Sequence, residues 1–418
     1  MTSKNQTECF VYITLPGQTE AVTVGRFVLS KSRDSTPLGK FVYGKSYLAR
    51  NNAVELDPVE LKLSEETYET VRLGGVFGAL RDSGPDYWGR RVIEKHAGKT
   101  VLGEVDYLLE SPDDRAGALG FGLGPEPPAP RRSFNKTLDL AKLQKIADDI
   151  VRGTIDEKDA DAVQAQELML IGTSMGGARP KTVVEDEQGL WIAKFNRADD
   201  RWNFGKVEHA MLVLAKKCGI SAAESRIVQV GGKDVLLVQR FDRFKTGKGY
   251  ARARMISGLT LLQADETERD RWSYISMAEE IRRIVAKPSK DASELFRRMC
   301  FNALISNIDD HPRNHALIAK EREWNLSPAY DLIPSPVVAQ DQRDLAMICG
   351  DRGRLASASN ILSQHTRFLL GPVEAKKIVD EMRQTVSATW YDVVRSEGVN
   401  EKDAEAIRAA FVYEGFYR

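Results

Sequence analysis

The order of hydrophobic and polar residues divides the chain into a β-rich first part and a helical second part. Between residues 9 and 60, short apolar runs are separated by Gly, Pro or Asp, which predicts strands near 10–15, 25–29 and 41–43. From residue 260 onward, apolar residues recur at helical spacing, which predicts helices over 272–285, 292–305, 372–386, 388–395 and 401–413. We therefore expect an α+β fold with two lobes.

The middle of the chain contains the best candidate for a linker. Residues 123–134 form a short polar run with four prolines. A loop inside one domain has the same composition, but we favour a boundary. The expected organisation is a β-rich subdomain over 1–122, the linker over 123–134, a further part over 135–241 and a helical lobe over 242–418.

Composition excludes several classes of protein. The chain has 418 residues, and its 60 basic and 60 acidic residues cancel, so no strong global field indicates binding to nucleic acid or membranes. Its four cysteines are scattered without a C-x-x-C pair, which favours a reduced, cytoplasmic setting. The sequence has no secretory signal and no apolar stretch of membrane-spanning length. We expect a cytoplasmic protein without a membrane partner.

The most informative stretch is residues 307–331. Asn314 follows Asp309 by five positions, and a second carboxylate, Asp331, follows a predicted hairpin. Phosphoryl transfer uses one Asp to accept the proton of the attacking hydroxyl, and an Asn and a second Asp to hold magnesium against the phosphates. The kinase catalytic loop has the same Asp-to-Asn spacing. An Asx-rich turn that caps a helix can have the same spacing, so other motifs in the chain must distinguish a catalytic loop from such a turn.

A glycine-rich loop at 172–181 is the second informative segment. Gly176 and Gly177 would let main-chain amides approach phosphate oxygens, while Arg179 and Lys181 supply positive charge. Kinases cover the phosphates with a glycine-rich loop. This loop is neither G-x-G-x-x-G nor a Walker loop, and a plain glycine turn explains the same residues.

A lysine and a glutamate follow the loop in the order that kinases use. Lys194 interrupts the apolar strand predicted at 190–195, and Glu208 begins an amphipathic helix that Gly219 ends. In kinases such a lysine binds phosphates and pairs with a helix glutamate. A lysine that extends to water and a first-turn glutamate favoured by the helix dipole explain each residue separately.

A hairpin across Gly231 and Gly232 precedes the predicted hinge. Runs 227–230 and 235–238 form its strands, and Gln239, Arg240 and Phe241 leave the second strand. In a kinase-like fold this segment meets the adenine edge and Phe241 stacks on the ring. An ordinary strand end with charged residues has the same pattern.

Six motifs in order resemble the HipA family, the kinase toxins of bacterial type II toxin–antitoxin modules. They are DDRAGAL (113–119), SMGGARPK (174–181), IAKF (192–195), VQRFDR (238–243), NIDDHPRNHAL (307–317) and LSPAYDLIPS (326–335). The resemblance implies a two-lobed, protein-kinase-like fold with a β-rich N-terminal lobe and an all-helical C-terminal lobe. It also implies serine/threonine kinase activity with ATP and Mg²⁺, a helix-turn-helix antitoxin similar to HipB, operator DNA reached through that antitoxin, and an aminoacyl-tRNA synthetase as the class of substrate.

The resemblance also assigns roles to individual residues. It makes Asp309 the general base, Asn314 and Asp331 the metal ligands, Lys194 the phosphate-binding lysine paired with Glu208, and Ser174 the site of autophosphorylation. The implied nucleotide contacts are Met175, Gly176, Gly177, Ala178, Arg179, Pro180, Lys181, Lys194, Gln239, Arg240, Phe241, His311, Tyr330 and Asp331. Arg179 and Pro180 replace a Gln-Glu pair of some members, and glutamine stands at 239 where an acid is frequent. Asp310 is a second acid beside the base, but the spacing to Asn314 favours Asp309.

Two other functions fit parts of the sequence. The D-x-H-x-x-N pattern of Asp309, His311 and Asn314 also resembles lipid kinases, so a lipid or small-molecule kinase is the alternative enzyme. An antitoxin-bound DNA corepressor is the alternative without catalysis, with Lys376, Lys377 and Arg383 as candidate phosphate contacts. A solvated charged helix face explains those three residues as well.

Overall fold

The structure, a computed structural model, describes residues 6–32, 34–97, 102–130, 134–152, 179–336, 339 and 341–417. The chain folds into two compact units. Unit 1 comprises residues 1–197, 240–256 and 318–323, and unit 2 comprises residues 198–239, 257–317 and 324–418. This division follows compactness alone, and the domain boundaries predicted from the sequence stay predictions.

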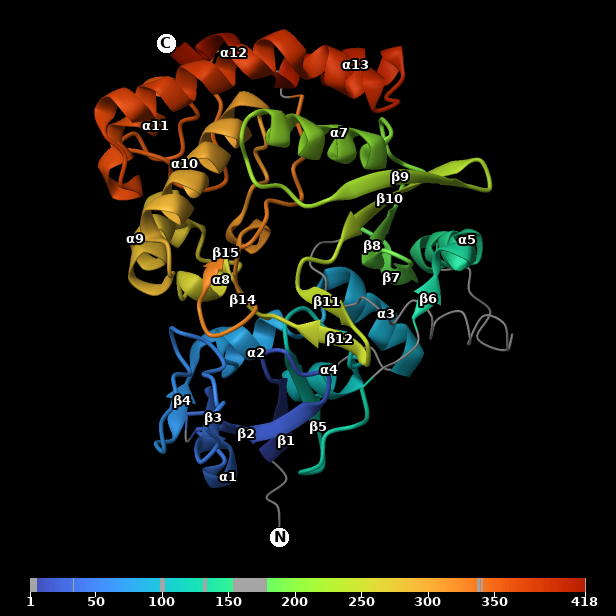
Figure 1. Cartoon of the computed structure of the whole chain (residues 1–418), viewed down its shortest axis with the longest axis vertical. Helices are drawn as coiled ribbons and strands as arrows, with labels where there is room; N and C mark the ends of the chain where they lie inside the picture. Colours follow the sequence, from blue (N-terminus) through green and yellow to red (C-terminus); the bar gives the residue numbers. More distant parts are fainter. Residues whose placement is uncertain are drawn as a thin grey trace. The chain divides into compact units, whose positions relative to one another are not determined.

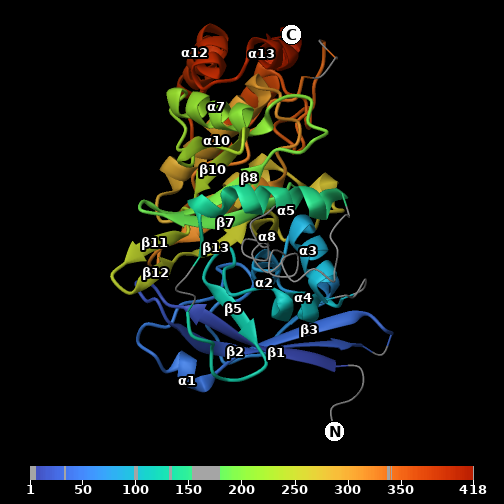
Figure 2. The same ribbon diagram turned by 90° about the vertical axis from the view of Figure 1, so that its right-hand side faces the viewer.

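Unit 1 contains a five-stranded antiparallel sheet with strand order β4-β3-β2-β1-β5 (Figures 1 and 2). Its inner face is aromatic, because Phe27, Phe41 and Tyr43 are buried and the Phe41 and Tyr43 rings meet edge-on at 4.9 Å. The predicted N-terminal strands are therefore confirmed. The strands are β1 (Gln6–Thr14), β2 (Ala21–Lys31), β3 (Pro37–Tyr43), β4 (Tyr68–Thr70) and β5 (Leu119–Gly122).

Four short helices accompany this sheet among the described residues of unit 1. They are α1 (Lys45–Leu48), α2 (Gly78–Asp82), α3 (Tyr87–Ala97) and α4 (Glu104–Glu110). Arg115 lies in the loop before β5, and its buried guanidinium donates to the carbonyls of Ser83, Leu108 and Ser111. One side chain thus ties α2 and α4 to the sheet.

The remaining strands of unit 1 carry the predicted lysines. Strand β6 (Asn135–Lys136) pairs in parallel with β7 (Lys181–Asp186), and β7 pairs in antiparallel with β8 (Gly189–Phe195). Helix α5 (Leu140–Arg152) buries an apolar stripe that includes Leu140, Leu143 and Ile146. A hairpin of β11 (Arg243–Thr246) and β12 (Gly249–Arg252) completes this unit.

Unit 2 begins with one helix and one hairpin, and both confirm the sequence predictions. Helix α7 (Phe204–Lys217) is capped by Asn203, whose side chain accepts from the Lys206 amide, and Gly219 (φ 75°) follows its end. Strands β9 (Ser225–Val230) and β10 (Lys233–Gln239) are joined by Gly231 and Gly232, whose φ values are 56° and 77°. Two successive positive φ values require the glycines that the sequence supplies.

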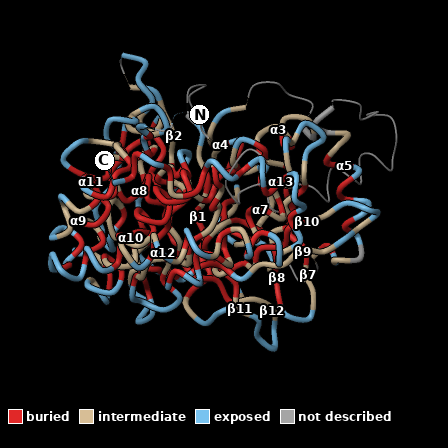
Figure 3. The backbone as a smooth tube through the Cα atoms, turned by 90° about the horizontal axis from the view of Figure 1, so that it is seen from above, coloured by how far each residue is buried: buried red, intermediate tan, exposed pale blue. Residues whose placement is uncertain are grey.

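Packed helices form the rest of unit 2 (Figure 1). Helix α10 contacts α9 and α12, and α12 contacts α7. Phe296 and Phe301 of α10 are fully buried, and Figure 3 shows buried positions in red and solvent-facing positions in pale blue. The helices are α8 (Gly258–Leu261), α9 (Tyr274–Ile284), α10 (Pro288–Leu304), α11 (Ala358–Ser363), α12 (Pro372–Ser396) and α13 (Glu401–Ile407).

Two expectations about the C-terminal part are wrong. The helices expected at 372–386 and 388–395 are the single helix α12, because Ser387 continues the helix. Residues 242–418 are not all helical, since they also contain β11, β12 and β13 (Arg254–Ser257). These four-residue strands are too short to give a clear alternating pattern. The hairpin predicted before Asp331 is confirmed, because β14 (Ala316–Ala319) pairs with β15 (Asn325–Leu326). No helix within the described ranges has both the length and the apolar character needed to cross a membrane.

Candidate active site

Unit 2 brings Asp309 and Asn314 together in one tight loop. The loop follows α10, and a short 3₁₀ helix at Pro312–Asn314 leads from it into β14. The carbonyl of Asp309 accepts from the His311 amide at 2.8 Å and from Asn314 Nδ2 at 3.4 Å. The Asn314 carboxamide is thus held over the main chain of Asp309, and its Oδ1 is not used in this contact.

The two neighbouring acids of this loop have opposite environments. Asp309 is exposed, whereas Asp310 is buried, with 1% of its surface accessible. The Asp310 carboxylate accepts from the Tyr274 hydroxyl and lies 2.8 Å from His315 Nε2. Burial, and then Asp310 itself, raises the pKa of Tyr274 well above its usual value, so its hydroxyl remains a donor. Of the two acids, Asp309 is the one placed to reach a substrate hydroxyl.

The segment that carries Tyr330 and Asp331 is fixed to the same loop. Ala329 exchanges main-chain hydrogen bonds with residues 221–223, and the Tyr330 hydroxyl donates to the Arg313 carbonyl at 2.8 Å. Asp331 adopts φ 58°, which is unusual for a residue with a side chain. Such strain costs about 1–3 kcal/mol and clusters at functional sites.

His311 sits on the other side of the loop, against Trp272. The two rings meet edge-on with centroids 6.4 Å apart. Its Nδ1 is buried and has no hydrogen-bond partner among the residues that the structure describes. His315 Nδ1 in the same loop shares this state.

The predicted lysines of unit 1 lie opposite each other. Lys181 and Lys194 are register partners of β7 and β8, so they share one face of the sheet. Lys181 is 2% exposed, and its Nζ pairs with Asp86 at 2.8 Å, while Lys194 is only partly buried. Sequence reasoning missed Asp86, although a lysine that starts a buried apolar strand signals the need for an acidic partner.

Other predicted nucleotide contacts are only partly described. Pro180 is buried and its carbonyl accepts from the Phe195 amide at 3.0 Å, and Arg179 is half-buried. The predicted ion pair of Lys194 and Glu208 would join residues of different units and stays a prediction; Glu208 itself is buried. The predicted autophosphorylation site and loop residues lie outside the described residues: Ser174, Met175, Gly176, Gly177 and Ala178.

The predicted hinge has main-chain contacts on both sides. The Gln239 amide donates to the Glu224 carbonyl in unit 2, and the Arg240 amide donates to the Leu190 carbonyl in unit 1. The Arg240 side chain has no exposed surface, and its guanidinium contacts Asp114 and Asp242. Phe241 is half-buried. Arg240 can therefore offer a nucleotide only main-chain groups.

A buried network links two of the motifs that carry the family resemblance. Asp242 accepts from the Gly117 amide at 2.9 Å, and Arg243 donates to the Gly117 carbonyl at 2.8 Å. Although burial opposes ionisation of Asp242, Arg240 and Arg243 outweigh it and hold its pKa well below the usual range. Burial, followed by Arg240, lowers the pKa of Arg243 to about 9. The network therefore stays ionised at neutral pH.

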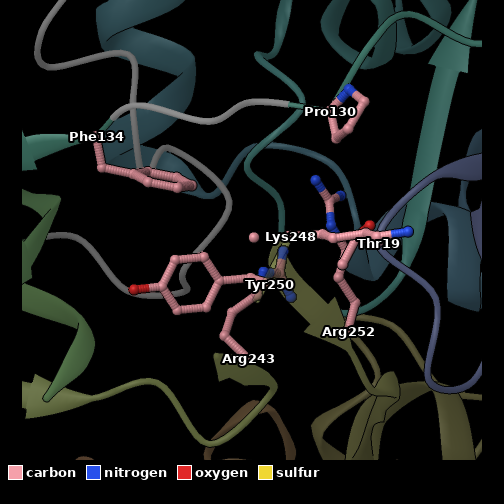
Figure 4. Close-up of a pocket in the computed structure, with 8 residues that line it drawn as sticks. Thr19, Pro130, Phe134, Arg243, Lys248, Tyr250 and Arg252 are labelled. Atoms are coloured by element: carbon pink, nitrogen blue, oxygen red, sulfur yellow. The ribbon is translucent and has the colours of Figure 1, made fainter. Parts of the chain in front are cut away.

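A small cavity of unit 1 lies beside the β11–β12 hairpin (Figure 4). It is lined by Phe134, Tyr250 and Arg252, among others, and its volume of about 10 Å³ is no larger than one water needs. A wider hollow of about 480 Å³ beside it is lined by Lys245, Lys248 and Glu185, among others. Neither hollow has a predicted site residue in its described lining, so the candidate site lies elsewhere.

Comparisons with known proteins agree with this α+β fold. The family model described as the HipA-like C-terminal domain matches residues 173–390, slightly more than half of the chain. The chain belongs to this HipA-like family, as the sequence motifs predict.

Three known proteins illustrate the similarity. A Sinorhizobium fredii protein named "Putative kinase Y4mE" is 23% identical over 36% of this chain and 37% of its own length. A Haemophilus influenzae protein named "Putative kinase" is 24% identical over 47% of this chain and 64% of its own length. The chain thus spans less than two thirds of either relative.

The third protein is a solved structure. HipA of Shewanella oneidensis MR-1, in a complex with HipB and its operator DNA, has a TM-score of 0.67 and 16% identity over 95% of both chains. At this identity the match establishes a shared fold.

Proposed function

We propose that this protein is an ATP- and Mg²⁺-dependent serine/threonine protein kinase that acts as the toxin of a type II toxin–antitoxin module. The observation that carries the proposal is the loop in unit 2, where Asp309 is exposed and Asn314 is bonded to the Asp309 carbonyl. Two relatives that carry the name putative kinase add support to the proposal.

The residues of the loop fit a bound magnesium ion. Mg²⁺ takes oxygen ligands and is bound through one or two carboxylates together with substrate phosphates. Asn314 engages the loop through Nδ2, which leaves Oδ1 as an oxygen ligand, and Asp331 has the strained main chain typical of functional positions. No cluster of three His, Cys, Asp or Glu side chains suited to a metal occurs among the described residues, and phosphate oxygens and water would complete the coordination of Mg²⁺.

The chain's own residues would then position the reactants. Asp309 would orient the acceptor hydroxyl for attack and take its proton as ADP leaves, while Asn314 and Asp331 would hold the metal. Mg-ATP supplies the phosphoryl group and neutralises the charge on the phosphates. Lys194 would contact the phosphates and pair with Glu208. The loop that ends with Arg179 to Lys181 would cover the phosphates, and residues 239–241 would contact the adenine.

The proposal extends to partners and regulation. The fold shared with a HipA that was solved with HipB and operator DNA supports a helix-turn-helix antitoxin that brings the complex to DNA. The substrate would be a protein such as an aminoacyl-tRNA synthetase, and autophosphorylation of Ser174 would switch the enzyme off.

Direct DNA contact by helix α12 is less well supported. Lys376 pairs with Asp380 at 2.5 Å and Lys377 pairs with Glu381 at 3.7 Å, each one turn along the same helix. The Arg383 guanidinium lies 5.3 Å from the centre of the Tyr417 ring. This pattern is typical of a solvated helix face.

The test compares wild type with Asp309→Ala before and after incubation with Mg-ATP, using intact mass and peptide mapping. Loss of the general base should lower phosphate transfer about 10²- to 10⁴-fold while nucleotide affinity is retained. Asp270→Ala, which removes another exposed acid of unit 2, is the matched control and should transfer phosphate normally. Equal incorporation in wild type and Asp309→Ala would overturn the assignment.

A further inference from the structure

The loop that holds Asp309 and Asn314 contains a second pair with the same five-residue spacing. Asp310 and His315 stand one position after each member of the first pair. Their side chains meet, with 2.8 Å between Asp310 Oδ2 and His315 Nε2, and they are 1% and 2% exposed. One pair is thus joined inside the protein, immediately beside the pair assigned to chemistry.

Tyr274 donates a hydrogen bond to the buried Asp310–His315 pair. This residue is the first of helix α9, is fully buried, and donates its hydroxyl to the same carboxylate oxygen. The Tyr274 ring also packs edge-on against His315, with centroids 5.6 Å apart. Tyr274 and His315, which lie far apart in the sequence, therefore contact the same carboxylate oxygen of Asp310.

Two asparagines extend this contact to the end of helix α10. Asn302 Nδ2 reaches the Tyr274 hydroxyl at 3.3 Å, and Asn307 Nδ2 donates to Asn302 Oδ1 at 3.0 Å. The Asn307 amide also donates to the Asn302 carbonyl at 2.8 Å. The entry to the loop and its interior are thus bonded to the same buried cluster.

His315 has one hydrogen-bonding nitrogen to offer this cluster. Its Nε2 faces Asp310, while Nδ1 is buried without a partner within the described part of the chain. A proton on Nε2 therefore makes a hydrogen bond, and a proton on Nδ1 would have no acceptor there. This fixes the tautomer and makes His315 a donor to Asp310.

We propose that Asp310, His315 and Tyr274 are positioning residues that hold Asp309 and Asn314 at a fixed separation for phosphate transfer. The Asp310–His315 contact closes the loop across its base, so the two functional residues cannot move apart without breaking a buried, charge-assisted hydrogen bond. The inference rests on the proposed kinase function, because it assigns a role to the support of that same site.

Two substitutions test whether the buried cluster positions the loop, and neither changes Asp309 or Asn314. Tyr274→Phe removes one hydroxyl, and His315→Phe removes both ring nitrogens but keeps an aromatic ring. His315→Gln is the rescue variant, because its amide can again donate to Asp310. Tyr413→Phe is the matched control, since it also removes a buried hydroxyl of unit 2, one that donates to the Ala356 carbonyl at 2.8 Å.

Two measurements are made on each full-length variant. The first is kcat for phosphate transfer from Mg-ATP, together with the affinity for a non-hydrolysable ATP analogue. We expect kcat to fall about 100-fold in His315→Phe, the size of effect that follows a misplacement of about 1 Å, with less than about a threefold change in affinity. His315→Gln should recover most of the loss. Tyr413→Phe should match Tyr274→Phe in melting temperature but keep wild-type kcat.

The second measurement does not depend on catalysis. Hydrogen–deuterium exchange of peptides covering 305–316 should be faster in His315→Phe and Tyr274→Phe than in wild type, and unchanged in Tyr413→Phe. Normal kcat and normal exchange in the folded His315→Phe variant would overturn the inference. If wild type transfers no phosphate, the proposed function fails, and loop exchange still decides whether the cluster holds the loop.

Discussion

Two motif-bearing regions of this protein use charged residues in opposite ways. In unit 1, Arg240 and Asp242 of the VQRFDR motif are buried and bind Asp114 and Gly117 of the DDRAGAL motif. In unit 2, the motif around Asp309 places one acid in solvent and buries the next. A functional motif can therefore contain residues that act on a ligand beside residues that only build the fold. The burial of each charged side chain and its ion-pair or hydrogen-bond partners show which residues are available to a ligand and which stabilise the fold.

Removing one charge from the buried network should have the largest effect on stability. Arg240→Ala removes one of the two buried arginines that pair with Asp114 and Asp242 and leaves only Arg243 beside the two acids. Breaking such a buried pair costs about 3–5 kcal/mol. Urea denaturation should show this loss, whereas Asp309→Ala should stay within about 0.5 kcal/mol of wild type because its side chain is exposed. Equal stability of Arg240→Ala and wild type would remove the distinction between the two regions.

Asp57 is a buried acid without an ion-pair partner among the described residues, in contrast to Asp242. Burial raises the pKa of Asp57 to about 6, even though the carboxylate accepts from the main-chain amides of Val59 and Glu60. Because the folded pKa exceeds the unfolded value, protonation favours the folded state, and this stability is lost as pH rises through about 6.

Asp57→Asn tests this pH dependence. The asparagine keeps one oxygen for the main-chain amides but cannot ionise, so it should gain up to about 3 kcal/mol over wild type at pH 8, and this advantage should disappear near pH 4. Denaturation midpoints at both pH values measure the difference. A difference that does not change with pH would show that Asp57 ionises normally.

The Lys181–Asp86 ion pair should show a smaller effect. Lys181→Met takes the cation away from a largely buried carboxylate, which costs about 1–3 kcal/mol. The double variant Lys181→Met/Asp86→Asn removes both charges, keeps an oxygen that accepts from the Gly89 amide, and should recover most of that loss. If Lys181→Met instead weakens ATP-analogue binding without changing stability, the lysine contacts nucleotide as first predicted.

Much of this structure follows from the sequence, but its buried polar contacts do not. The 2.0 and 3.6 periods correctly predicted β1, β8, the β9–β10 hairpin and α7, because each has a clear apolar pattern and glycine at its turns. The short strands β11 to β13 have no such pattern, and the sequence places them in a helical lobe, whereas the hairpin of β14 and β15 is predicted correctly. The sequence predicts two helices over 372–386 and 388–395, whereas α12 continues through Ser387 because one serine does not end a helix.

The candidate site shows the same division. The five-residue spacing singled out Asp309 over Asp310, and the exposure of the two side chains agrees with that choice. Partners distant in the sequence were not visible: Tyr274 lies 36 residues before Asp310, and Asp86 lies 95 residues before Lys181. Only the three-dimensional structure brings such residues together, since no local pattern encodes a pairing over that distance.

We infer that the adjacent acids Asp309 and Asp310 of one loop have different roles, and paired assays of Asp309→Asn and Asp310→Asn would show whether they do. Each variant is assayed for phosphate transfer from Mg-ATP by intact mass and for melting temperature. The account predicts that Asp309→Asn loses transfer but melts as wild type. Asp310→Asn should melt at a lower temperature, because an amide cannot accept from both Tyr274 and His315 as well as the carboxylate does. Loss of transfer without any change in melting temperature in Asp310→Asn, together with normal transfer in Asp309→Asn, would contradict the account and make Asp310 the base.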